Sequence, residues 1–178
     1  MKSFIKKYQK ILLVLLWFLF ISATFVLYLL DNELQTPYST GIVSFELAKD
    51  LSSSEAIVNA WNTRAKTFAG ISLGFDFLYI FIYTSLLSML LYLRISKYNT
   101  RHFMYKAGHI LIFAVFFAGI FDIIENIALI KLLTGHRQAI WSSVAYMSAV
   151  LKFGLISLSV LFILGSLINA FFKRKKWS

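Results

Sequence analysis

Four long apolar stretches constrain this chain more than any other feature of its sequence. An α-helix rises about 1.5 Å per residue, so about 20 consecutive apolar residues cross the hydrocarbon core of a bilayer. Stretches of this kind occupy 11–30, 70–93, 107–133 and 141–172. We therefore predict an all-α membrane protein, in which residues 1–178 form a single membrane domain built on a four-helix transmembrane bundle. A composition with 59% hydrophobic residues agrees with this class.

The distribution of charge predicts the orientation of the helices. The N-terminal segment, the connector 94–106 and the C-terminal segment each carry four lysines or arginines, which together are most of the 18 in the chain. All eight acidic residues lie in the segment 31–69 or within apolar stretches. Because cytoplasmic loops are enriched in Lys and Arg, we expect both termini in the cytoplasm and 31–69 outside.

Contacts with a membrane explain the net charge of +10. The basic residues flank apolar stretches, where they contact anionic lipid headgroups, and no nucleic-acid recognition motif accompanies them. The expected partners are therefore the lipid bilayer and its anionic headgroups, with a protein partner or a second copy of the chain as a further alternative, and no nucleic acid.

The side-chain inventory argues against cofactor chemistry. The chain has no cysteine, which excludes disulfides, thiol redox chemistry and Cys-bound metal. His102 and His109 fall on the opposite side of the predicted membrane from His136, so the three cannot form a metal site. We expect no metal and no cofactor.

The third apolar stretch contains two carboxylates and an amide. Asp122, Glu125 and Asn126 fall on one helical face at 100° per residue, whereas Ile124 and Ile127 lie away from it. Ionisable residues within a membrane helix are costly and usually face a protein neighbour or a wet cavity. The trio is thus the centre of the predicted functional site.

Two further charged residues fall at a similar depth in other helices. Asp76 lies about two turns inside the second stretch, on one face with Tyr79 and Tyr83, and Lys152 lies near the middle of the fourth. Small residues accompany Lys152 on its face, which predicts the packing side of that helix. We expect Asp76, Lys152 and the trio of the third stretch to converge.

Three acids against one lysine leave a surplus of negative charge, which would require a proton, water, a cation or an arginine from the outer loop. The preferred hypothesis is a binding or transport-type protein, whose outward-facing site takes a proton, a cation or a polar headgroup. The alternative is a structural or interaction subunit in which the same charges only hold the bundle together. A lipid-modifying enzyme is the third hypothesis, and the chain contains none of the common catalytic motifs.

The residue pattern of segment 31–69 predicts a helical layer outside the bundle. We expect a short helix over residues 40–49 and a second helix that starts with Ser52 as the cap and Glu55 completing a capping box. An apolar stripe then continues through the helix. Its members are Ile57, Trp61, Ala65 and Phe68.

Two interpretations of this outer layer remain open. In the preferred one it is an amphipathic surface helix with Trp61 at headgroup depth. In the other it is a lid over the mouth of the bundle, which contributes Glu46 or Arg64 to the site.

Several short motifs resemble a known group of proteins. They are Ser39-Thr40-Gly41-Ile42, Glu46-Leu47-Ala48, Leu73-Gly74-Phe75-Asp76-Phe77-Leu78-Tyr79, Asp122-x-x-Glu125-Asn126 and Lys152-Phe153. With these motifs, about residues 39–165 resemble an uncharacterised family of small bacterial four-helix integral membrane proteins. The resemblance implies a location in the bacterial cytoplasmic membrane and brings no activity with it.

Overall fold

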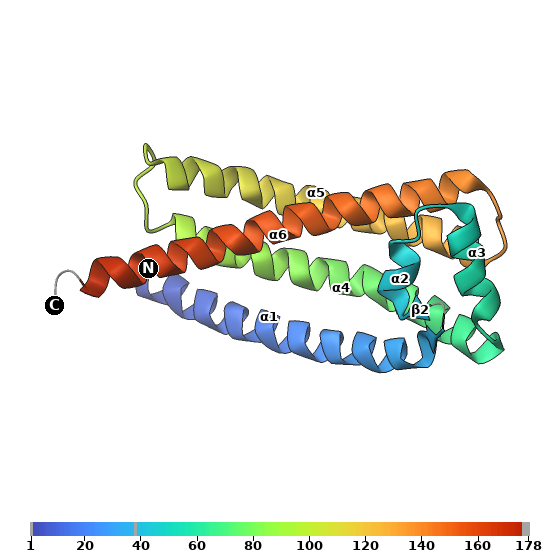
Figure 1. Ribbon diagram of the computed structural model, residues 1–178. Helices are drawn as coiled ribbons and strands as arrows, with labels where there is room; N and C mark the ends of the chain where they lie inside the picture. The colour runs from blue at the N-terminus through green and yellow to red at the C-terminus, as the bar shows by residue number, and fades with distance from the viewer. Residues whose placement is uncertain (1, 38, 176–178) are drawn as a thin grey trace.

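The computed structural model describes residues 2–37 and 39–175, and the side chains at 2–7, 171 and 173–175 are not part of that description. Over these residues the chain is almost entirely helical (Figure 1). The elements are α1 (Lys2–Asp31), a 3-10 turn (Asn32–Leu34), β1 (Gln35–Thr36), β2 (Ser39–Thr40), α2 (Ile42–Glu46), α3 (Leu51–Ala60), α4 (Thr63–Ile95), α5 (Phe103–Leu133) and α6 (Ala139–Lys175).

The prediction of four long apolar helices is confirmed. Within the described residues, four helices (α1, α4, α5 and α6) are long and apolar enough to cross a membrane, and each contains one predicted stretch. Helices α4 and α5 begin before their apolar stretches, at positions where polar residues cap them. The Asn62 side chain, for example, accepts a hydrogen bond from the backbone N–H of Ala65 at 2.8 Å and starts α4 seven residues before the predicted stretch at 70.

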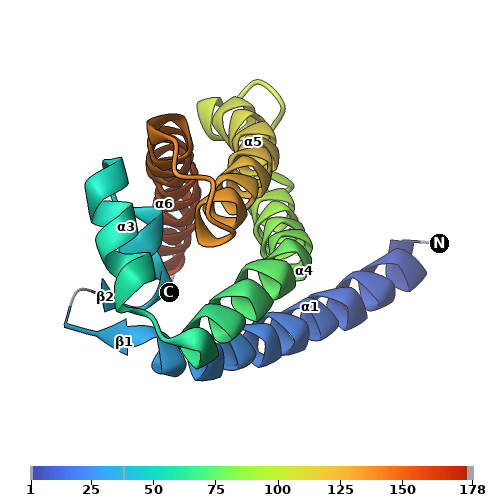
Figure 2. The ribbon, with the colours of Figure 1, turned by 90° about the vertical axis from the view of Figure 1, so that its right-hand side faces the viewer.

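The long helices are arranged around α4 and α5. Helix α5 packs against both α4 and α6, whereas α1 packs mainly along α4, at the edge of the bundle (Figure 2). Small buried residues allow the close approach of α6 to α5, among them Ala145, Ala149 and Ser159. The bundle therefore has three tightly packed helices and one peripheral helix.

One end of the bundle is covered by the segment between α1 and α4. The strands β1 and β2 form a two-residue antiparallel hairpin, and α2 and α3 follow it across the helix ends (Figure 1). Leu34, Phe45 and Trp61 are buried there against the ends of α4 and α5. This outer layer thus has its own apolar core, which it shares with the bundle.

The predicted cap of the second outer helix is wrong by two residues. Asp50 is the cap of α3: its Oδ1 atom accepts hydrogen bonds from the backbone N–H of Ser53 at 2.8 Å and from the hydroxyl of Ser52 at 2.7 Å. Glu55, the other half of the predicted capping box, instead faces Arg137 at 3.6 Å. The carboxylate is a stronger acceptor than the neighbouring hydroxyl, so the helix begins at Leu51.

The preferred interpretation of the apolar stripe is also wrong. The chain leaves the helical conformation at Trp61, where ψ is 126°, and α4 starts as a separate helix. Trp61 is 2% exposed, its indole N–H donates to the carbonyl of Leu34 at 3.0 Å, and its ring packs edge-on against Phe45. The tryptophan therefore joins the outer layer to the bundle instead of being exposed on the face of an amphipathic helix.

A sharp turn at Gly41 sets the position of α2. Gly41 has φ 131°, and the next residue, Ile42, donates its backbone N–H to the Asp31 carboxylate at 2.6 Å. A Cβ atom at position 41 would overlap that carboxylate. The end of α1 and the start of α2 therefore depend on the absence of a side chain at this position.

Gly41→Ala should lower the stability of the purified protein by about 1–3 kcal/mol, because the new side chain meets both a disfavoured φ and the Asp31 carboxylate. Gly74→Ala is the control, since a Cβ atom there would meet open space in the middle of α4, and it should be neutral or stabilising by up to about 1 kcal/mol. Thermal unfolding in detergent measures both. Equal midpoints for the two variants would contradict this account of the turn.

Candidate functional site

The polar residues of α5 are buried on one face of that helix. Asp122, Glu125 and Asn126 are all less than 4% exposed, whereas Ile124 and Ile127 on the other side are exposed. Residues one or two turns away along the same face, such as Ala118 and Leu129, are also buried. The helical face predicted from the spacing is therefore the interior face.

Lys152 joins this face to α6 and to the outer layer. Its Nζ atom donates to Asp122 Oδ1 at 2.8 Å and to Glu125 Oε1 at 2.9 Å. Glu46 Oε2, from α2, lies 3.5 Å from the same nitrogen. Charge-assisted hydrogen bonds of this length are strong, so one ammonium group connects α6 to α5, with α2 within ion-pair distance.

Two side chains of α4 complete the cluster. The Tyr83 hydroxyl donates to Asp122 Oδ2 at 2.9 Å, so both oxygens of Asp122 are occupied. The Asn126 amide donates to Asp76 Oδ2 at 2.7 Å. Within the described part of the chain, no basic side chain lies within ion-pair distance of Asp76. We call these residues the carboxylate–lysine cluster. Its members are Glu46, Asp76, Tyr83, Asp122, Glu125, Asn126 and Lys152.

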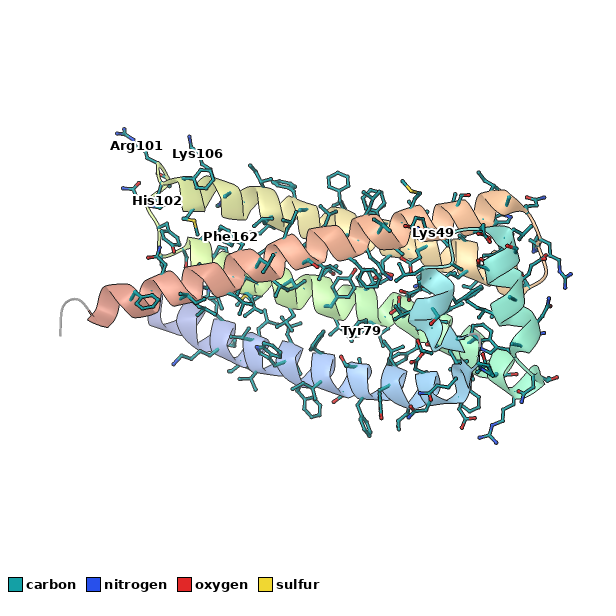
Figure 3. The ribbon with its side chains drawn as sticks, viewed as in Figure 1. Lys49, Tyr79, Arg101, His102, Lys106 and Phe162 are labelled. Atoms are coloured by element: carbon teal, nitrogen blue, oxygen red, sulfur yellow. The ribbon has the colours of Figure 1, made fainter. Side chains whose placement is uncertain are left out.

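Two of the remaining candidates are not members of the cluster. Tyr79 borders the cluster and lies between α4 and α1 (Figure 3). Its hydroxyl shares a hydrogen bond of 3.1 Å with Thr24, and its ring stacks on Phe20. Arg64 does not reach the site, because it pairs with Glu33 at 2.9 Å on the surface. The outer layer therefore contributes a fourth acid, Glu46, and not the neutralising arginine.

A cavity of about 760 Å³ adjoins the cluster. It is open to the outside of the molecule, and residues of α1, α2, α4, α5 and α6 line it. Its polar end is lined by Glu46, Asp76, Asp122, Asn126 and Lys152, and the rest of its wall is mainly apolar. The volume is within the range of small-molecule binding sites.

The contribution of α1 to this cavity was not predictable from the sequence. Thr24, Leu27 and Asp31 line it, together with Trp17. Within a uniformly apolar stretch a single threonine does not identify the face that a helix turns inward, so only the partner helices can reveal it.

Acceptor atoms exceed donors in the cluster. Glu125 Oε2 and Asn126 Oδ1 are buried and have no hydrogen-bond partner within the described residues, and Glu46 Oε2 has only the long contact of 3.5 Å with Lys152 Nζ. Buried polar groups in proteins nearly always have a partner, because a missing hydrogen bond costs about 1–3 kcal/mol. The site therefore has the chemistry to receive a proton or a group that donates hydrogen bonds.

Glu46 has a perturbed protonation equilibrium. Burial raises the pKa of its carboxyl group above the ordinary 4.5, the Lys152 ammonium opposes that shift, and the Asp122 carboxylate adds to it. The folded protein thus holds a proton on Glu46 at pH values where the unfolded chain has lost it.

No group of three or more His, Asp or Glu side chains within the described residues has the geometry to hold a metal ion. The ammonium of Lys152 occupies the point between the carboxylates. Comparisons with protein-family models, with curated proteins and with solved structures found no match for this chain.

Lys152→Met should destabilise the protein by about 3–5 kcal/mol, because it leaves Asp122 and Glu125 buried without their cation. Adding Asp122→Asn and Glu125→Gln should restore part of the loss, since both charges are then removed. Lys49→Met, at an exposed lysine over the Tyr146 ring, is the control and should change stability by less than about 0.5 kcal/mol. Unfolding midpoints that agree for the two lysine variants would refute the structural role of Lys152.

Stability should depend on pH through Glu46. A carboxyl group with a raised pKa in the folded state stabilises the protein below its unfolded pKa, and that contribution is lost as the pH rises above about 4.5 towards the folded value. Glu46→Gln removes this dependence. The free energy of unfolding of the variant, relative to that of the wild type, should therefore rise between pH 5 and pH 8. Denaturation curves at several pH values give the difference. Two parallel pH profiles would contradict the assignment.

Proposed function

We propose that this chain is a multi-pass protein of the bacterial cytoplasmic membrane, with both termini in the cytoplasm. We further propose that its carboxylate–lysine cluster binds a polar or cationic, hydrogen-bond-donating group that enters from the outer side. The four apolar helices support the membrane assignment.

The two ends of the bundle differ in charge as the proposed orientation requires. Arg101, His102 and Lys106 lie at the end of the bundle away from α2 and α3 (Figure 3). The first residues of α1 and the last residues of α6 are at that same end (Figure 1). The N-terminal lysines at 2, 6 and 7 and the basic residues at 173–176 also count toward this orientation, and their side chains fall outside the described residues. The positive-inside rule places this end in the cytoplasm.

Helix α1 provides a scale for the depth of the cluster. Its apolar run 11–30 is about 30 Å long, which matches the hydrocarbon core, so Asp31 marks the outer boundary. Thr24, seven residues before Asp31, is about 10 Å inside. It bonds to Tyr79, and Asp76 precedes Tyr79 by about one turn toward the outer side. The outer part of the cluster, around Asp76, thus belongs to the outer third of the membrane, within reach of headgroups and water.

The main support for the proposed binding site is the surplus of carboxylates in the cluster. Among the described residues the cluster holds four carboxyl groups and one ammonium group, and two of its buried acceptors, Glu125 Oε2 and Asn126 Oδ1, have no partner. A network that served only to hold helices together would be expected to have its acceptors satisfied, because half-satisfied buried networks are costly. A ligand with donor groups or positive charge supplies what is missing.

One observation favours the alternative, structural role. The Lys152 bonds to Asp122 and Glu125 are short and fully buried, as expected for an ion pair that fixes the register of two helices. The two roles involve different atoms, since Lys152, Asp122 and Glu125 can hold α5 to α6 while Asp76, Asn126 and Glu46 face the ligand.

A matched pair of cysteines tests whether the cavity is wet. The natural chain has no cysteine. Thr24→Cys places a thiol on the cavity wall. Phe25→Cys places one at the same depth on an exposed face of α1 that does not line the cavity. Only the first should react with a small, membrane-impermeant cationic thiol reagent added from outside.

The charge of the reagent provides a second readout. An anionic reagent of the same size should react with Thr24→Cys about tenfold more slowly, since the carboxylates repel it. Equal rates at 24 and 25 would exclude an open polar site.

A further inference from the structure

The cavity continues from its polar end into a long apolar groove. Leu87 and Leu90 of α4 line one wall, Val160, Leu164 and Leu167 of α6 line another, and Trp17 of α1 lines the third. A site for a small polar solute or a metal ion would not require this apolar extension. The groove therefore indicates that the ligand has an apolar part as well as a polar group.

The size of the groove matches one hydrocarbon chain. Along α6 the lining residues run from Ile156 to Leu167, a distance of about 17 Å, and one leaflet of a bilayer contributes about 15 Å of hydrocarbon. The whole cavity, about 760 Å³, is in the volume range of sites for small-molecule ligands, which is large enough for a single chain with a small head.

The groove is open on the side between α1 and α6. Val160, Leu164 and Leu167 line it and are nevertheless 37%, 49% and 46% exposed. Helix α1 packs along α4, and the end-on view shows it well separated from α6 (Figure 2). In a bilayer this side faces lipid, so a chain can enter sideways with its head at the outer level.

The head end selects positive charge. Asp31, Glu46 and Asp76 line it, and of these three only Glu46 lies within ion-pair distance of a basic side chain among the described residues, Lys152 at 3.5 Å. The stacked rings of Phe20 and Tyr79, centred 5.6 Å apart, border the same space. Carboxylates favour an ammonium group and repel a phosphate.

We propose that the cavity binds a single-chain amphiphile with an ammonium head, drawn from the surrounding bilayer between α1 and α6. The head lies among Glu46, Asp76 and the Tyr79 ring, and the chain lies in the apolar groove. This proposal rests on the proposed function and names the class of its ligand.

Thermal unfolding of the purified full-length chain in neutral nanodiscs tests this ligand class. The probes are hexadecylamine, hexadecyl phosphate, hexadecanol and the short butylamine. Hexadecylamine at about ten times its dissociation constant should raise Tm by roughly 3–6 °C. The other three, at the same concentration, should not.

Matched variants assign the binding to the groove. Leu164→Trp fills it and should weaken the response to hexadecylamine at least tenfold. Leu161→Trp, on the exposed side of the same turn of α6, should leave the response unchanged. Asp76→Asn should remove the preference for the amine over hexadecanol while the protein stays folded.

The contrary outcomes separate the two proposals. An equal shift with butylamine and no effect of Leu164→Trp would overturn the groove while leaving a polar binding site in place. An equal shift with hexadecyl phosphate would overturn the ammonium head. No shift with any amine, together with an unreactive Thr24→Cys, would refute the proposed function as well.

Discussion

The ammonium group of Lys152 is the interaction on which the rest of the structure depends. It places α6 against the acidic face of α5 and lies within ion-pair distance of Glu46 on α2. Without it, Asp122 and Glu125 would be buried in an apolar bundle with no cation, at a cost of about 3–5 kcal/mol. The lysine makes short hydrogen bonds to two carboxylates of the protein. The remaining acceptors are therefore the part of the cluster that is available to a ligand.

The fold was predictable where a single physical requirement dominates. Length and apolarity identified all four long helices, and helical spacing identified the buried face of α5, because a carboxylate such as Asp122 has few stable places in an apolar helix. The outer layer was less predictable. Trp61 satisfies an amphipathic pattern equally well as a surface residue or as a core residue, and only the Leu34 carbonyl, from a distant part of the chain, decides between them.

The candidate site was also predictable from the sequence only in part. Asp76, Asn126 and Lys152 meet because three helices carry polar groups at compatible depths, which spacing and length can reveal. The approach of Glu46 depends on the Gly41 turn and on its bond to Asp31, both of which are tertiary features. Arg64 was an equally good candidate by sequence, but Glu33 lies nearer to it. The groove could not be foreseen, since it results from the peripheral position of α1.

The arrangement of the ion pairs along the chain has a consequence for biosynthesis. Asp122, Glu125 and Lys152 belong to consecutive helices joined by a short turn. In the proposed orientation, helix α5 alone would enter the bilayer with two carboxylates lacking a cation, whereas α5 and α6 together form a hairpin whose charges balance in part. We therefore expect these two helices to insert as one unit, and Glu46 of α2 to approach Lys152 after that hairpin has formed.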